Sequence, residues 1–178
     1  YHDEKFEITE DEVSKYFNSL KEREKSNDRT TTAGDFLYDL CSNICLMYFE
    51  RGKYYFTHRS FQEYFCALYF SKQKDKNLES IGDFFENRHS RMYGDRTFNM
   101  MYDMIPDKVE EYIFLPFLTR LYERCDSGEG YWTFLKTLYP YLRYVQGETE
   151  EYIDNDPQSY IYSFIKQLVR YGNVDCNH

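Results

Sequence analysis

The sequence lacks an apolar run long enough to cross a membrane. Its longest uncharged stretches, such as residues 40–49, contain about ten residues, roughly half of what a membrane-spanning helix needs. It also lacks a basic, apolar leader, and it starts with Tyr1 rather than Met, so we expect an internal piece or a processed form of a longer chain. No membrane partner is expected.

Basic residues are in deficit. Lys and Arg number 22 against 31 for Asp and Glu, which gives a formal net charge of −9. This is the wrong sign for contact with a phosphate backbone, so no nucleic acid is expected as a partner.

Phosphate-binding and catalytic motifs are also missing. None of the eight glycines starts a G-x-x-x-x-G-K-[ST] run, and Gly52-Lys53 is followed by Tyr54. There is no G-x-S-x-G elbow and no H-E-x-x-H pair, and the four histidines are isolated. We therefore expect that this chain alone is not an enzyme and holds no metal or cofactor.

The five cysteines are an odd number, and three of them lie among Phe, Leu and Tyr, as small buried hydrophobic residues do. Cys41 and Cys45 could hold a metal together with His58 or Cys66, but a C-x3-C spacing on an apolar helix face is a weak signal. Buried structural cysteines are the preferred interpretation. This usage indicates a reduced, cytoplasmic protein.

Aromatic residues are abundant. They make up 20% of the 178 residues, with 20 Tyr and 15 Phe, which excludes a disordered chain. The length fits one domain or two small ones.

The first seventy residues predict helices and one hairpin. A helix over residues 8–20 begins with a capping box of Thr9 and Glu12. A second helix, capped by Asp35, ends near residue 45, and two aromatic-rich runs over residues 46–57 enclose Arg51-Gly52 as a β-hairpin. Next, Ser60 and Glu63 form a capping box for a helix to about residue 71, with an apolar stripe that we expect to be buried; the stripe consists of Phe61, Tyr64, Phe65, Leu68 and Tyr69.

The rest of the chain predicts helices only. The apolar spacing indicates helices over residues 78–87, 97–105, 107–124 and 131–145, with Pro116 and Pro140 as interruptions. A loop over residues 146–157 follows. The last helix is capped by Asp156, has Pro157 in its first turn and stops at Gly172.

Together these elements predict a mainly α fold in two domains. The order helix, helix, hairpin, helix over residues 1–72 is that of a winged helix with one β-hairpin. An all-helical bundle over residues 73–178 follows, without further strands.

Residues 55–70, which read YFTHRSFQEYFCALYF, carry the most specific pattern. They resemble the F-x-H-x-[ST]-F-Q-E-[FY]-[FL]-A-A motif at the winged helix of NACHT-type STAND NTPases, a group that contains NOD-like receptors and many bacterial defence proteins. The resemblance covers about residues 34–72, and Cys66 replaces the usual first Ala of the motif. The helices after residue 78 resemble the family only in their placement and character.

The resemblance implies a regulatory region of a signalling or defence NTPase rather than an enzyme. In this family the winged helix folds back on the NTPase core, and its histidine, here His58, contacts a phosphate of ADP. ADP, ATP and Mg²⁺ would then be held by the core of the parent protein, and oligomerisation could accompany activation. Independently of the family, His58 directly precedes a helix N-terminus, where anions are favoured, although a purely structural hairpin-end role also fits.

The rival interpretation is a winged-helix DNA-binding module of a transcription regulator. It is disfavoured because residues 30–50, where the recognition helix is expected, contain no Lys or Arg but do contain Asp35, Asp39 and Glu50.

Overall fold

The computed structural model describes residues 7–23, 30–88, 94–125, 127–139 and 157–171. These residues are mostly helical with one small antiparallel sheet, which confirms the predicted mainly α fold. The chain divides into two compact units, Tyr1–Cys66 and Ala67–His178, here called unit 1 and unit 2. The predicted boundary between residues 72 and 73 stays a prediction.

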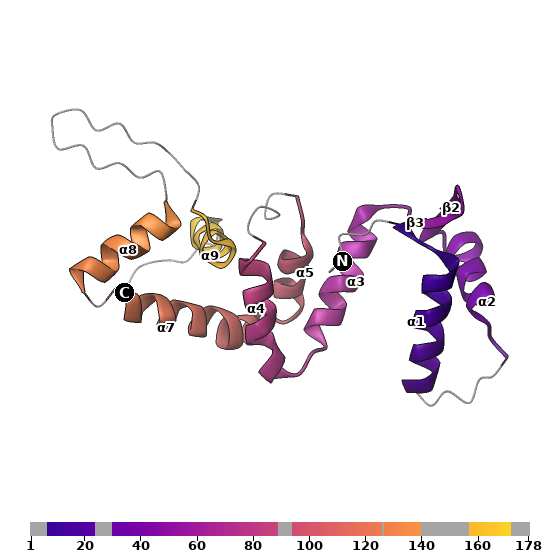
Figure 1. Cartoon of the computed structure of the whole chain (residues 1–178), viewed down its shortest axis with the longest axis horizontal. Coiled ribbons are helices and arrows are strands. Elements are labelled where there is room, and N and C mark those ends of the chain that lie inside the picture. Colours follow the sequence, from indigo (N-terminus) through magenta and orange to yellow (C-terminus); the bar gives the residue numbers. More distant parts are fainter. Residues whose placement is uncertain (1–6, 24–29, 89–93, 126, 140–156, 172–178) are drawn as a thin grey trace. The chain divides into compact units, whose positions relative to one another are not determined.

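Unit 1 combines short helices with the sheet (Figure 1). Its elements, in chain order, are β1 (Glu7–Ile8), α1 (Glu10–Arg23), α2 (Ala33–Tyr38), a π turn (Asp39–Asn43), β2 (Met47–Glu50), β3 (Lys53–Phe56) and the first half of α3 (Arg59–Ser71).

The sheet has the strand order β1-β3-β2. The predicted hairpin of β2 and β3 is confirmed, and its turn residues Arg51 and Gly52 have φ of 50° and 79°, the left-handed region that a tight hairpin turn requires. Strand β1 was not predicted, because two residues carry no periodicity. It is positioned by distant contacts: Glu7 pairs with Lys53 and accepts a hydrogen bond from the Tyr55 hydroxyl at 3.3 Å.

The predicted caps of the first two helices differ in outcome. The capping box of Thr9 and Glu12 is confirmed, with the Thr9 amide donating to the Glu12 carboxylate at 2.9 Å. Asp35 as the cap of the second helix was wrong, because Thr32 is the N-cap and Asp35 is the partner three residues later. Hydrogen bonds from the side chain and backbone of Thr32 lower the pKa of the Asp35 carboxyl.

Helix α3 exposes the face that was predicted to be buried. The exposed fractions of Phe61, Tyr64 and Phe65 are 37%, 43% and 40%, whereas Glu63 and Ala67 are buried. Aromatic residues at helical spacing indicate that one face is apolar, but they do not indicate that this chain covers it. The predicted core role of Phe61 and Phe65 was therefore wrong.

All elements of regular structure among the described residues of unit 2 are helical (Figure 1). Its elements are the second half of α3, a 3-10 turn (Asp75–Asn77), α4 (Leu78–Glu86), α5 (Thr97–Met104), α6 (Pro106–Val109), a π turn (Glu110–Phe114), α7 (Leu115–Arg124), α8 (Gly128–Leu138) and α9 (Tyr160–Tyr171). No strand follows residue 80 in the part of the chain that the structure describes, as predicted.

An aromatic cluster forms the core of unit 2. Phe98 of α5 is 0% exposed and lies 4.9 Å, ring centroid to ring centroid, from both Phe85 of α4 and Phe164 of α9. Tyr160 and Phe114 complete the cluster at 5.4 and 6.3 Å from Phe98. Rings at these distances are in favourable contact, so the cluster connects four helical segments that are distant in sequence.

Proline marks the predicted division of residues 107–124. The Leu115 amide donates to the Glu110 carbonyl across a π turn, and Pro116 lies in the first turn of α7. A proline ring crowds the carbonyl four residues earlier, and the wider π turn relieves this crowding.

The last two helices begin at other residues than predicted. α8 starts at Gly128, where Ser127 accepts a hydrogen bond from the Gly130 amide at 2.9 Å. α9 starts at Tyr160, three residues after Pro157, so the predicted start was wrong. The predicted cap Asp156, the interruption at Pro140, the loop over 146–157 and the stop at Gly172 lie wholly or largely outside the described residues.

The start of α9 is fixed by a contact across the unit. The Glu86 carboxylate of α4 accepts a hydrogen bond from the Ile161 amide at 2.9 Å, and the Ser159 hydroxyl accepts one from the Tyr162 amide at 3.2 Å. These bonds satisfy amides that a helix N-terminus leaves without partners. Glu86 is 75 residues away in sequence, so local pattern could not indicate this cap.

Across the described ranges, every helix is too short or too polar to span a bilayer.

Candidate functional site

His58 lies between β3 and α3 and is exposed. Its Nδ1 accepts a hydrogen bond from the Ser60 amide at 3.2 Å and lies 2.7 Å from the Ser60 hydroxyl. Its carbonyl accepts from the Phe61 amide at 3.1 Å. His58 is thus the N-cap of α3, a position usually taken by Ser, Thr, Asp or Asn.

The cap indicates which ring nitrogen of the imidazole accepts. Because an amide N–H can only donate, Nδ1 of His58 must be the acceptor, and the neutral ring carries its proton on Nε2. Among the described residues no hydrogen bond to this Nε2 is found, so His58 keeps one N–H donor for an external acceptor.

The predicted capping box of Ser60 and Glu63 was wrong. Ser60 is already inside α3, and the Glu63 carboxylate forms an ion pair with Arg59 at 2.9 Å, one helical turn apart. The sequence pattern S-x-x-E fitted the box, but His58 occupies the capping position two residues earlier. The polar groups at the start of α3 are therefore the His58 imidazole, the Ser60 hydroxyl and the Arg59 guanidinium, which is paired with Glu63.

One turn beyond His58, α3 presents an aromatic surface. We call Phe61, Tyr64 and Phe65 the α3 aromatic face. The rings of Tyr64 and Phe65 are in edge contact at 5.5 Å, and Phe65 lies 6.3 Å from Phe56 of β3. Grouped exposed rings of this kind are typical of protein contact surfaces.

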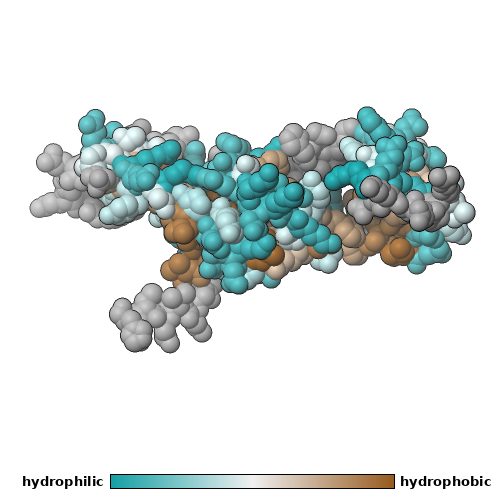
Figure 2. Space-filling model, turned by 90° about the horizontal axis from the view of Figure 1, so that it is seen from below, coloured by the Kyte–Doolittle hydropathy of each residue, from teal (hydrophilic) through white to brown (hydrophobic). Residues whose placement is uncertain are grey.

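Exposed apolar side chains are frequent in unit 1 as a whole. Only Leu37 and Met47 of its described apolar residues are fully buried. The large exposed ones are Tyr16, Leu20, Phe36, Tyr38, Ile44, Tyr48, Phe49, Phe61, Tyr64 and Phe65. Figure 2 shows apolar patches, in brown, between hydrophilic side chains on the face seen from below. Unit 1 therefore has many large apolar side chains that its described residues leave exposed.

The cysteines are less buried than predicted. Cys41 and Cys66 are half-buried and Cys45 is exposed, so the expectation of three fully buried residues was wrong. Partial burial, together with the neighbouring Cys45 thiol, raises the pKa of the Cys41 thiol. A raised pKa disfavours the thiolate that metal binding and nucleophilic attack require.

Within the residues that the structure describes, no group of three or more His, Cys, Asp or Glu side chains could hold a metal ion.

The residues 33–43 that would carry a DNA-recognition helix contain no Lys or Arg. No observation therefore favours the DNA-binding alternative.

Comparison with known proteins finds similarity in the second half of the chain. Residues 102–178 match a family model described as a short NACHT-associated C-terminal domain, family 14. No curated protein and no solved structure matches the chain. The matched segment begins inside α5 and does not include the residues 55–70 that carry the motif. Two separate segments thus indicate the same association, and the match supports a NACHT-associated protein.

Proposed function

We propose that the chain is a non-catalytic, regulatory part of a NACHT-type NTPase. In this proposal unit 1 with the remainder of α3 is a winged helix that packs on the NTPase core in the ADP-bound state. The observation that carries it is the N-cap geometry of His58, which uses Nδ1 for the cap and leaves Nε2 as a donor at a helix N-terminus. The NACHT-associated match of residues 102–178 supports the assignment independently.

The chemistry of His58 suits a phosphate oxygen. The partial positive charge of a helix N-terminus favours an anion, and an Nε2–H at the same place can donate to it. ADP, ATP and Mg²⁺ would be bound by the core of the parent protein, with His58 adding one contact in the closed form. A hydrogen bond to a charged group contributes about 1.5 to 3 kcal/mol, which is a change of about 10- to 100-fold in ADP retention.

The α3 aromatic face would provide the apolar part of the same contact. Phe61, Tyr64 and Phe65 expose 37% to 43% of their surface, and burying such rings against the core would stabilise the closed state by removing them from water. Release of this contact would give the open state, and oligomerisation could follow there. We place such a protein in the cytoplasm, in signalling or defence.

Two substitutions of His58 separate its capping role from its phosphate contact. His58→Asn keeps a side-chain oxygen that caps α3, because Asn is among the best N-cap residues, but it removes the Nε2–H. His58→Ala removes both. ADP dissociation is measured from the full-length NACHT protein, and the melting temperature from the 178-residue chain.

We expect both variants to release ADP at least about tenfold faster, while only His58→Ala lowers the stability of the chain, by about 1 kcal/mol. If His58→Asn releases ADP at the wild-type rate, His58 is a cap and nothing more. Exposed Glu10→Gln is the matched surface control and should change neither quantity.

A further inference from the structure

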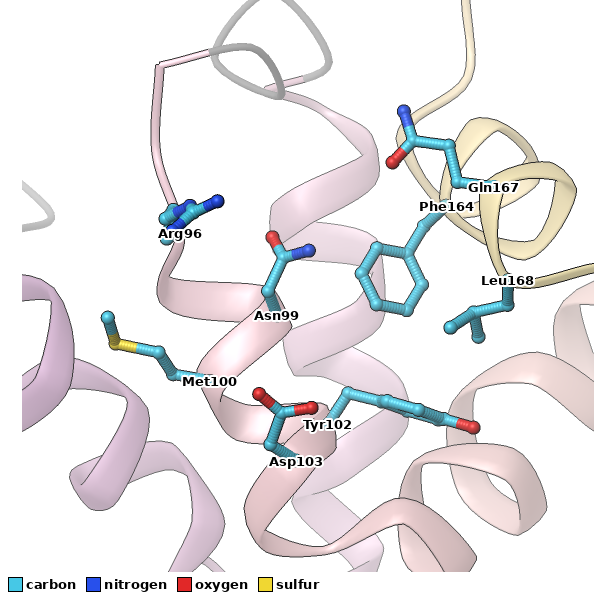
Figure 3. A pocket seen from close by; sticks show the side chains of 8 residues that line it. All are labelled: Arg96, Asn99, Met100, Tyr102, Asp103, Phe164, Gln167 and Leu168. Atoms are coloured by element: carbon cyan, nitrogen blue, oxygen red, sulfur yellow. The ribbon is translucent and has the colours of Figure 1, made fainter. Parts of the chain in front are cut away.

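A groove between α5 and α9 in unit 2 has the features of a ligand site. It encloses about 550 Å³, within the usual range for small-ligand and peptide pockets. Its floor includes Phe164 and Leu168 of α9 and the ring of Tyr102 of α5. In Figure 3, Asn99 of α5 and Phe164 face each other across it.

The floor of the groove is rigid. Tyr102 stacks on Phe114 at 5.7 Å and meets Phe164 edge-on at 5.5 Å. Its hydroxyl donates to the Glu110 carboxylate at 2.7 Å, and this bond, with partial burial, raises the pKa of Tyr102 to about 12. The ring therefore stays in place, and its hydroxyl is already engaged.

Besides Tyr102, four polar side chains line the groove. Among the described residues, Arg96, Asn99, Asp103 and Gln167 make no side-chain hydrogen bond or ion pair. Two charges of opposite sign and two amides thus line one apolar floor without a hydrogen bond or ion pair to the part of the chain that the structure describes. Such groups fix the orientation of a ligand in sites that are otherwise apolar.

A second cavity of about 510 Å³ lies between α7, α8 and residues 158–159 before α9, and most of its polar groups are engaged. Its Ser127 and Ser159 cap helices, Thr133 donates to the Glu129 carbonyl, and Glu86 caps α9. Its polar groups mostly hold the fold together, which makes the α5–α9 groove the better candidate.

We propose that the α5–α9 groove binds an extended peptide segment with an acidic residue at one end, a basic residue three positions away and apolar residues between them. Arg96 would receive the acidic side chain and Asp103 the basic one. Asn99 and Gln167, on opposite walls, each carry a donor and an acceptor that match the N–H and C=O of a peptide bond. Leu168 and the ring of Tyr102, which are half-buried, would contact the apolar side chains.

The spacing of the charges supports a peptide of this length. Arg96, the N-cap residue of α5, precedes Asp103 by seven residues, which is roughly 10 Å along the helix axis at 1.5 Å per residue. An extended chain in the polyproline II conformation covers this distance in three steps of about 3.1 Å, and its three residues per turn bring side chains three positions apart to the same side. A free amino acid is too short to reach both charges.

The test uses two peptides, acetylated and amidated, with the sequences Glu-Leu-Phe-Lys and Lys-Leu-Phe-Glu. Binding to the full 178-residue chain is followed by NMR shifts of amides in α5 and α9. We expect the wild type to prefer one peptide by about fivefold, the effect of two exposed ion pairs. In the charge-swapped variant Arg96→Glu/Asp103→Arg, the preference should invert.

A control swap at two exposed residues outside the groove, Lys74→Glu/Glu123→Lys, should keep the wild-type preference. The proposal is wrong if neither peptide binds at millimolar concentration, if the wild type binds both equally, or if the swapped variant keeps the wild-type preference. It is also wrong if free leucine displaces the peptides at equal concentration. The groove lies in unit 2 and His58 in unit 1, so this proposal can fail while the proposed function stands.

Discussion

Replacing Phe98 with alanine should destabilise unit 2 more than any substitution on the α3 aromatic face. Phe98 is 0% exposed, and four aromatic rings surround it at centroid distances of 4.9 to 6.3 Å. Truncation of a buried Phe to Ala costs about 3 to 5 kcal/mol, because it removes buried apolar area and leaves a cavity. We expect a loss in this range, since four separate helical segments meet at this ring.

Equilibrium unfolding in urea measures this effect. The single Trp of the sequence, Trp132, lies in α8, so its fluorescence reports unit 2 directly. Should Phe98→Ala fail to fold, Phe98→Leu keeps most of the apolar volume and gives a smaller loss in the same direction.

The matched control is Phe65→Ala, the same change at a ring that is 40% exposed. It should lower the free energy of unfolding by about 1 kcal/mol, because much of this side chain is already in water. Far-ultraviolet circular dichroism follows this transition. Equal losses for Phe98→Ala and Phe65→Ala, or a loss below about 1 kcal/mol for Phe98→Ala, would refute the assignment of the core.

Three further predictions concern unit 2. Glu86→Ala removes the acceptor of the Ile161 amide and should lower the free energy of unfolding by about 1 kcal/mol, measured in urea by Trp132 fluorescence. An unchanged midpoint would contradict the cap. Thr97→Val should leave the melting temperature unchanged or raised, because the buried Thr97 hydroxyl has no hydrogen-bond partner among the described residues, and a marked decrease would show that it has one. The pKa of Tyr102 is raised to about 12 by its bond to Glu110, so its contribution to stability is present below about pH 10 and is lost as the pH rises toward 12. Tyr102→Phe has no such contribution to lose, so its free energy of unfolding should fall less between about pH 10 and 12 than that of the wild type. Urea unfolding at a series of alkaline pH values measures both.

Sequence pattern predicted those elements whose causes are local. The apolar spacing located α4 and α5 to within one residue, and Arg51-Gly52 located the hairpin turn. The cap of α1 was also local, since Thr9 and Glu12 are three residues apart.

Elements that depend on distant residues were missed or shifted. Strand β1 exists through pairing with β3, and α9 begins where Glu86 can accept its amide. The candidate site shows the same limit. The motif identified His58, but its role as N-cap follows from a bond that no sequence rule for caps includes.

Burial was the least predictable property. Helical spacing identified the α3 aromatic face, and the structure leaves it exposed. In unit 2 the same kind of spacing identified residues that are buried, such as Phe85 and Phe164. Helical spacing shows that a helix has an apolar face, but a single sequence does not show which other surface packs on that face.

Hydrogen–deuterium exchange of the proposed parent NTPase tests most directly whether His58 and the α3 aromatic face contact an NTPase core. The comparison is between protein saturated with ADP and protein saturated with a non-hydrolysable ATP analogue. The account predicts that peptides covering residues 57–66 exchange more slowly with ADP, and that His58→Asn reduces this difference. Equal exchange of these peptides in both nucleotide states would contradict it.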